Sequence, residues 1–194
     1  LGEVFCSRES PLTQQAQNLG HQAFRHGLEQ GDLATTEGRA NLFRSLCRHV
    51  PQHVWYSPVS GPWSSWSALN ASRSVEHQAK YQQLRHEHRY QIALGIVLYR
   101  HQIAKGLHFH WEQPQRSLMM LHPGLNELHQ HTQSCQFDMC RVGNLVDPET
   151  KIPMKKGMQI LTTHEPIFRA LHGRACNGEH THQPIEGSTK CQGS

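Results

Sequence analysis

The sequence predicts an α/β domain with a mostly parallel sheet and helices on both of its faces. Short apolar segments alternate with longer amphipathic segments, which is typical of strands joined by helical crossovers. The 194 residues suffice for one well-buried domain and are short for two. We therefore expect one domain over residues 1–188, followed by a loose polar tail at residues 189–194.

The first part of the chain shows the alternation most clearly. Apolar runs predict strands at residues 2–6, 21–24 and 53–56. Between these runs, residues 12–20 and 36–49 have the periodicity of amphipathic helices.

The longest helix is predicted over residues 74–105. Ser74 is a suitable N-cap, and Gly106 is a suitable terminating residue. Apolar residues recur at helical spacing in the second half only: Ile92, Ile96, Tyr99 and Ile103. We therefore expect this second half to be buried and the polar first half to face solvent.

Further strands and helices are expected downstream. The predicted strands are residues 107–111, 136–140 and 159–163, and the predicted helices are residues 123–131 and 166–171. A turn is expected at residues 112–114, Glu-Gln-Pro, directly after the first of these strands.

The net charge and the hydropathy of the chain limit the kinds of partner and cellular location that we expect. The formal net charge of +4 is a modest excess that suits a polyanionic partner without demanding one. No apolar stretch approaches the roughly 20 residues that span a bilayer, so we expect no membrane segment. No signal peptide is evident, and we expect an intracellular location, cytoplasmic or nuclear. Because the chain opens inside its first predicted strand, we also expect it to be a piece of a longer protein.

Two short segments carry the strongest chemical signal. Residues 57–64 read Ser-Pro-Val-Ser-Gly-Pro-Trp-Ser and follow the predicted strand at residues 53–56. Ligands of open α/β sheets bind at the carboxyl ends of strands, where a proline-bounded loop would hold the Ser60 hydroxyl. Residues 111–114, Trp-Glu-Gln-Pro, place Glu112 at the end of another strand. Taken singly, the first segment is more often a surface turn and Glu112 a solvated side chain.

In this order, the two segments resemble motifs of the cytosine-5 DNA methyltransferases. Residues 57–64 are similar to the family's Ser-Pro-Pro-Cys-x-x-Phe-Ser loop, with Ser60 in place of the attacking cysteine. Residues 112–114 are similar to its Glu-Asn-Val motif, and closer to the Glu-Asn-Pro version of compact phage relatives. The segments that follow have the order found in methyltransferase-like proteins of phages and mobile-element polyproteins: residues 137–143, 155–163 and 176–182.

The resemblance covers residues 2–188 and implies a Rossmann-like methyltransferase fold with S-adenosylmethionine as cofactor. It implies a nucleic-acid partner, DNA in preference to RNA, and gives no expectation for the oligomeric state. It assigns Ser60 and Glu112 to catalysis. The cofactor-binding residues that it implies are Phe5, Ser7, Glu9, Ser10, Asp32 and Pro58. Four family features are missing: the Gly-x-Gly of the front loop, an acid after the second strand, a Gln-x-Arg-x-Arg motif and a separate target-recognition domain.

The serine bears directly on activity. In the family that this chain resembles, a cysteine thiolate adds to carbon 6 of an extruded cytosine, and carbon 5 then receives the methyl group. A serine hydroxyl is a much weaker nucleophile without an adjacent base. His53 and His110 would supply that base only if the fold brings them near Ser60. The resemblance therefore implies a methyltransferase-like domain with little or no activity as written.

Cysteine and histidine also predict a metal site. Without secretory context, the six cysteines favour reduced thiols or metal ligands over disulfides. Cys176, His180 and His182 lie close together in sequence, and Cys140 or Cys135 would complete a tetrahedral zinc site. We take Cys140 as the fourth ligand, and we expect the zinc to be structural because four protein ligands leave no open position.

Other functions remain as alternatives. One is a non-catalytic nucleic-acid-binding or scaffolding domain, and another is a zinc-stabilised interaction domain without a cofactor. A hydrolase that uses Ser60 is disfavoured because no Gly-x-Ser-x-Gly elbow is present. Trp55 is expected in the core, whereas Trp63 and Trp66 either pack there or stack on a base.

Overall fold

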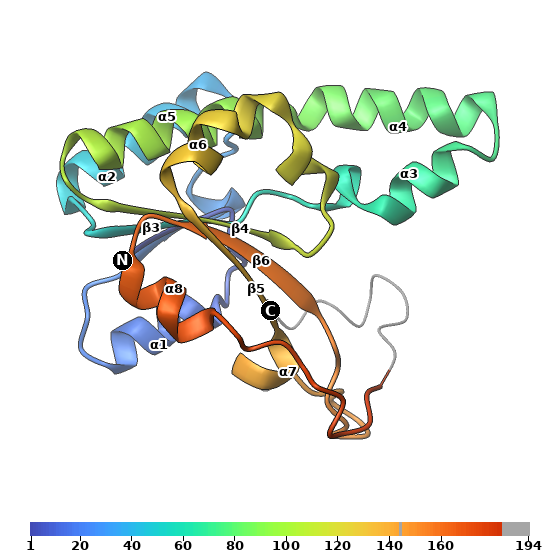
Figure 1. The fold of residues 1–194 in the computed structure, drawn as a ribbon. Coiled ribbons are helices and arrows are strands. Elements are labelled where there is room, and N and C mark those ends of the chain that lie inside the picture. Colours follow the sequence, from blue (N-terminus) through green and yellow to red (C-terminus); the bar gives the residue numbers. More distant parts are fainter. Residues whose placement is uncertain (144, 184–194) are drawn as a thin grey trace.

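The computed structural model describes residues 1–143 and 145–183 and contains one six-stranded sheet with helices on both faces (Figure 1). The strand order is β2-β1-β3-β4-β6-β5. Strands β1 to β4 run parallel, whereas β6 runs antiparallel to both of its neighbours. The strands are β1 (Gly2–Val4), β2 (Phe24–His26), β3 (His53–Tyr56), β4 (His108–Pro114), β5 (Gln133–Asp138) and β6 (Gly157–Thr162). The prediction of an α/β fold with a mostly parallel sheet is confirmed.

The helices form two layers and one projection (Figure 1). They are α1 (Pro11–Asn18), α2 (Thr36–His49), α3 (Ser65–Ala71), α4 (Val75–His88), α5 (Tyr90–Ala104), α6 (Asn126–His131), α7 (Met139–Val142) and α8 (Glu165–Leu171). Helices α2, α5 and α6 cover one face of the sheet, and α1, α7 and α8 lie on the other (Figure 1). Helices α3 and α4 extend away from the sheet to one side.

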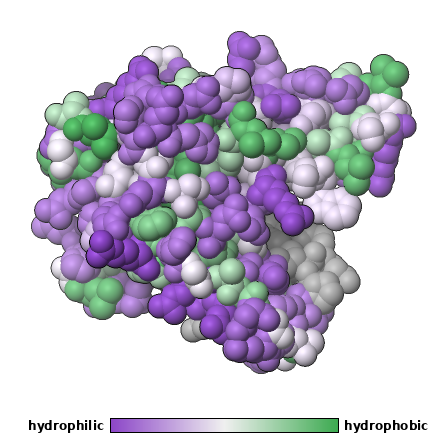
Figure 2. Space-filling view, in the orientation of Figure 1, coloured by the Kyte–Doolittle hydropathy of each residue, from purple (hydrophilic) through white to green (hydrophobic). Residues whose placement is uncertain are grey.

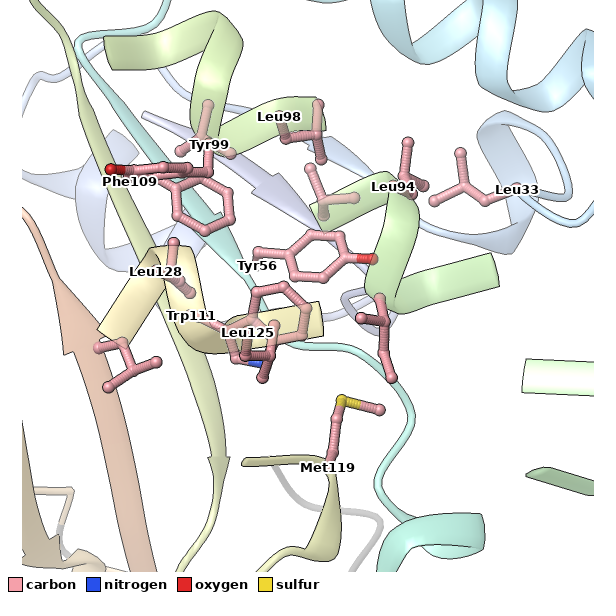
Figure 3. Packing of buried hydrophobic residues seen from close by; sticks show 14 of the residues in the cluster. Leu33, Tyr56, Leu94, Leu98, Tyr99, Phe109, Trp111, Met119, Leu125 and Leu128 are labelled. Atoms are coloured by element: carbon pink, nitrogen blue, oxygen red, sulfur yellow. The ribbon is translucent and has the colours of Figure 1, made fainter. Parts of the chain in front are cut away.

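The main core lies between the sheet and α5. Side chains alternate along a strand, so Tyr56 of β3 and Phe109 and Trp111 of β4 face this layer (Figure 3). Val54 of β3 belongs to the same buried cluster. The rings of Tyr56 and Trp111 meet edge to face, with centroids 4.9 Å apart. Gly95 of α5 lies directly on them: a Cβ atom there would be 2.2 Å from Trp111 Cζ3. The absence of a side chain at Gly95 therefore allows α5 to pack closely against the sheet.

The opposite face is apolar only toward its far edge. There Cys135, Phe137, Met158 and Ile160 of β5 and β6 pack together with α7 and α8. Nearer the middle, β1 places the buried carboxylate of Glu3 on this face, where it accepts hydrogen bonds from the hydroxyls of Ser10, the N-cap of α1, and Thr13 of α1. This polar region lines the candidate site described below.

The long helix predicted over residues 74–105 is two helices, α4 and α5, divided at Arg89. Ser74 caps the first by accepting a hydrogen bond from the His77 amide at 3.2 Å, as expected. Gly106 follows the second with φ of 68°. At the junction the Ile92 amide donates to the Arg89 carbonyl, three residues back, which tightens the backbone. The apolar α5 packs on the sheet, whereas all but a few side chains of polar α4 face solvent.

The turn predicted at residues 112–114 is wrong, because these residues continue β4. They pair with residues of the antiparallel strand β6, which extends past the end of β3 and supplies hydrogen-bond partners there. Other boundaries differ too. The strand predicted at residues 2–6 ends at Val4, the strand predicted at residues 21–24 lies at Phe24–His26, and the strand predicted at residues 136–140 is Gln133–Asp138. Part of the predicted domain, residues 184–188, and the predicted loose tail at 189–194 lie outside the described residues.

The visible surface is mostly hydrophilic, with hydrophobic atoms in separate small groups (Figure 2). Among residues 1–143 and 145–183, no helix combines the length and apolar character needed to cross a bilayer.

Candidate functional site

The candidate site lies where the direction of chain progression across the sheet reverses. From β1 the chain moves outward to β2 and then returns to the other side of β1 to form β3. The loops after β1 and β3 therefore diverge, and open α/β sheets bind ligands at such points, beyond the carboxyl ends of the strands.

A cavity of about 590 Å³ opens at this point. Its volume falls within the range of roughly 300–1,000 Å³ that is usual for small-molecule sites. Six of the residues singled out from the sequence line it: Phe5, Ser7, Ser10, Pro58, Ser60 and Glu112. Glu9 and Asp32 do not line it. Glu9 is exposed, and Asp32 Oδ1 accepts a hydrogen bond from the Ala34 amide in the turn before α2.

The Ser60 loop is held at both ends. Before Ser60, the Pro58 carbonyl accepts a hydrogen bond of 2.6 Å from Gln113 Nε2 of β4. After it, the Trp63 amide donates to the Ser60 carbonyl at 2.9 Å, and the Trp63 side chain is buried. The Arg85 guanidinium of α4 stacks over the Trp63 ring, 4.4 Å from its centroid. The loop thus presents Ser60 from a fixed backbone.

Glu112 is fixed beside this loop. Its Oε2 accepts hydrogen bonds from Trp55 Nε1 at 2.6 Å and from Ser57 Oγ at 3.0 Å. Both donors belong to β3 or to the residue that follows it, so the carboxylate of β4 is tied to the strand that carries the Ser60 loop. Trp55, expected in the core, is only partly buried and lines the cavity.

A second cavity, of about 470 Å³, adjoins the first at Ser60, which lines both. Arg116 and Lys155 bring positive charge to its wall, and Trp66 brings an aromatic side chain that is 73% exposed. Of the two tryptophans whose position was left open, Trp63 is therefore a core residue and Trp66 is a surface residue at this cavity.

Neither a histidine nor a reactive thiol accompanies Ser60 among the described residues that line the two cavities. His53 and His110 line neither cavity, and their imidazoles contact each other instead, with Nδ1 of His53 3.0 Å from Nε2 of His110. Cys6 does line the large cavity, but burial and the nearby Glu3 carboxylate raise the pKa of its thiol to about 11. The Cys6 thiol is therefore protonated at neutral pH and is a poor nucleophile.

Sequence reasoning missed Glu3 and Gln113, which both line the large cavity. Glu3 Oε2 accepts hydrogen bonds from Ser10 Oγ and, at 2.6 Å, from Thr13 Oγ1, so a buried carboxylate anchors the first turn of α1. An acidic residue inside the apolar run at residues 2–6 was the available signal. No acid was expected directly after the second strand; in the structure Glu29 follows β2, and its carboxylate pairs with Arg25 and Arg8.

The four predicted metal ligands come together at the end of β5. One ligand atom from each of Cys140, Cys176, His180 and His182 lies within 4.8 Å of the others. Cys140 belongs to α7, and the other three lie on the segment after α8. Cys135, the other candidate for the fourth ligand, is instead buried in the core of β5 and β6. The cysteines of residues 1–143 and 145–183 form no disulfide.

The chain matches no protein-family model, no curated protein and no solved structure. The features that bear on function are the two cavities, the fixed positions of Ser60 and Glu112, and the cysteine–histidine cluster.

Proposed function

We propose that this chain is an S-adenosylmethionine-dependent methyltransferase-like domain of the cytosine-5 DNA type, impaired by Ser60. The observation that carries the proposal is the convergence of three segments distant in sequence. The loop after β1, the Ser60 loop after β3 and Glu112 of β4 all line one cavity where the chain reverses direction. The Rossmann-like methyltransferase fold is part of the proposal, and four parallel strands with helical connections support it.

The large cavity would hold the cofactor. S-adenosylmethionine has a planar base, a ribose, a sulfonium and an amino-acid end, and it supplies the methyl group when bound. Phe5, Pro58 and Leu171 offer apolar contacts to such a molecule, and the Ser7 hydroxyl offers a hydrogen bond. The Ser10 hydroxyl donates to Glu3 and would shape the loop around the cofactor. The loop lacks the Gly-x-Gly of the family, but the side chains of Ser7 and Ser10 are small and would allow the cofactor to approach the backbone closely.

The smaller cavity would hold the target base of a nucleic acid. Arg116 and Lys155 would neutralise phosphates, and Trp66 would stack on a base. Ser60 lines both cavities, so it lies between the space for the methyl donor and the space for the acceptor. Glu112, fixed by Trp55 and Ser57, lines the large cavity, so it would bind the ring nitrogen of a base that reaches past Ser60 from the smaller cavity.

Serine at position 60 would impair methyl transfer without preventing the binding of cofactor or nucleic acid. A hydroxyl needs a base to attack carbon 6, and no histidine is among the described residues that line the two cavities. We therefore expect the chain to bind cofactor and nucleic acid while transferring methyl groups very slowly. Replacing Ser60 with cysteine would restore a nucleophile whose pKa of about 8.5 allows thiolate formation near neutral pH.

The test begins with calorimetric titration of the whole chain with S-adenosylhomocysteine, the demethylated product. Ser60→Cys is then incubated with S-adenosylmethionine and DNA containing 5-fluorocytosine. Fluorine at carbon 5 removes the proton that must leave, so a covalent enzyme–DNA adduct should persist through denaturation. We expect this adduct with Ser60→Cys and none with the native serine.

Two controls make the result specific. Ser65→Cys places a thiol in the smaller cavity but not in the large one, and it should give no adduct. Ser60→Cys combined with Glu112→Gln should give far less adduct than Ser60→Cys alone. Absence of S-adenosylhomocysteine binding by the folded chain would contradict the proposal. If DNA still bound under those conditions, the non-catalytic nucleic-acid-binding alternative would gain support from the basic wall of the smaller cavity.

A further inference from the structure

We propose that Cys140, Cys176, His180 and His182 bind one structural zinc ion, through the two Sγ and two Nε2 atoms. These residues belong to two separate segments, the short helix α7 and the stretch after α8. The inference stands apart from the proposed function, since a metal measurement requires neither cofactor nor nucleic acid.

The spacing of the ligand atoms matches a tetrahedral site. With Zn–S near 2.3 Å and Zn–N near 2.0–2.1 Å, the edges of a tetrahedron are about 3.3–3.8 Å long. Cys176 Sγ lies 3.7 Å from His180 Nε2 and 3.3 Å from His182 Nε2. All four ligand atoms lie within 4.8 Å of one another, so small adjustments of the side chains would close the site.

The surroundings of Cys176 orient it as a ligand. Its backbone amide donates to Asp138 Oδ2 at 2.7 Å, which ties the segment to the end of β5. The Asp138 amide in turn donates to the Arg174 carbonyl at 3.1 Å. The Gly178 amide also donates toward Cys176 Sγ, at 3.5 Å. An amide directed at sulfur stabilises the thiolate that a metal requires, and such second-shell contacts fix ligand geometry.

The chemistry of the four ligands indicates which metal would bind and that its role would be structural. Two thiolates and two imidazoles in a tetrahedron suit zinc, whereas magnesium and calcium require oxygen ligands. The nearby carboxylate of Glu179 is paired with Arg141 at 3.6 Å. Because the four protein ligands fill the tetrahedron, no position is left for water or substrate. The zinc would therefore cross-link α7 to the segment after α8 rather than perform chemistry.

The direct test measures metal in the whole chain purified without chelators. Plasma mass spectrometry should find about one zinc per chain, and native mass spectrometry should show the zinc on the folded species. Exchange for Co²⁺ should give the intense visible bands of tetrahedral cobalt together with thiolate-to-cobalt charge transfer in the near ultraviolet. Binding should release two protons, one from each thiol.

Substitutions at the ligands can distinguish loss of zinc coordination from loss of folding. Cys176→Ser and His182→Ala should lose the bound zinc, whereas His182→Cys, which keeps a ligand at that position, should retain it. Cys47→Ser is the matched control, because Cys47 is an exposed free cysteine on α2, and its zinc content should stay near one. A folded native chain with less than a tenth of an equivalent of zinc after reconstitution would overturn the proposal. So would a disulfide between Cys140 and Cys176 in the protein purified under reducing conditions.

Discussion

Gln113 is the residue that connects the Ser60 loop to β4. Its buried amide donates to the Pro58 carbonyl at 2.6 Å, and its Oε1 accepts from Ser117 Oγ at 2.9 Å. Gln113→Met keeps the approximate volume and leaves both partners unsatisfied. Because an unpaired buried polar group costs about 1–3 kcal/mol, we expect the free energy of unfolding to fall by about that amount. Urea unfolding followed by circular dichroism measures this change.

The matched control is Gln82→Met on the exposed surface of α4. This substitution should change the free energy of unfolding by less than about 0.5 kcal/mol. Equal effects of the two substitutions would mean that the hydrogen bonds of Gln113 do not hold the loop.

The rings of four histidines contact one another: His53, His108, His110 and His164. Burial, with smaller contributions from the neighbouring imidazoles, lowers the pKa of His110 to about 3 and that of His53 to about 4. In the unfolded chain both would titrate near 6.5. Between these values the unfolded state binds more protons, so the free energy of unfolding should decrease as the pH falls from about 6.5 toward 4.

Urea midpoints between pH 7.5 and pH 4.5 test this dependence. In His110→Gln the decrease should become shallower, because one buried imidazole no longer has to be protonated on unfolding. His86→Gln changes an exposed histidine of α4 and should leave the slope unchanged. A slope that His110→Gln does not alter would assign the acid sensitivity to other groups.

At the scale of elements, the contact of α5 with the sheet depends on Gly95. Helix propensity alone predicts that Gly95→Ala would stabilise the protein by up to about 1 kcal/mol. The structure predicts the opposite sign, because the new Cβ would lie 2.2 Å from Trp111 Cζ3 and 2.8 Å from Tyr56 Cε1. Overpacking of this kind typically costs about 1–3 kcal/mol.

Thermal unfolding of Gly95→Ala would decide between these two signs. Ala93→Ser, on the exposed side of the same helix, is the control and should have little effect. A higher melting temperature for Gly95→Ala would show that α5 can move away from the sheet at little cost.

The elements that the sequence predicted best are those with local signals. Helix α2 and strand β3 have the predicted boundaries, Thr36–His49 and His53–Tyr56, because a cap, an amphipathic pattern and an apolar run define them. The continuation of β4 through Pro114 was missed because its partner is β6, far along the chain. The break at Arg89 was missed because it accompanies the packing of α5 on the sheet.

In the candidate site, too, the residues with a local sequence signal were predicted and those without one were missed. Motif order indicated Ser60, Glu112 and the loop after β1, and these residues line one cavity. Glu3 and Gln113 were missed because their roles arise from hydrogen bonds across strands and to α1 that no local pattern encodes. The metal ligands His180 and His182 were evident from spacing, whereas the choice of Cys140 over Cys135 depended on where β5 ends.

At the scale of the whole molecule, the proposed zinc site and the proposed cofactor site share a wall. Cys140 lies on α7, and its neighbours Met139, Val142 and Gly143 line the large cavity. The Asp138 side chain, which holds the Cys176 segment, also lines the smaller cavity. A metal that fixes α7 should therefore favour the cavity shape that binds cofactor, and binding at the two sites should be thermodynamically linked.

We expect zinc removal to weaken S-adenosylhomocysteine binding by about 5-fold or more, the lower end of typical coupling between sites. Calorimetry on the native chain with and without zinc, and on His182→Ala, measures this loss, while Cys47→Ser should bind as the native chain does. Because linkage is reciprocal, S-adenosylhomocysteine should also slow zinc extraction by a chelator. Unchanged affinity in folded, zinc-free protein would show that the wall keeps its position without the metal. Absence of binding to the zinc-loaded native chain would instead contradict the cofactor assignment and leave the metal site untouched.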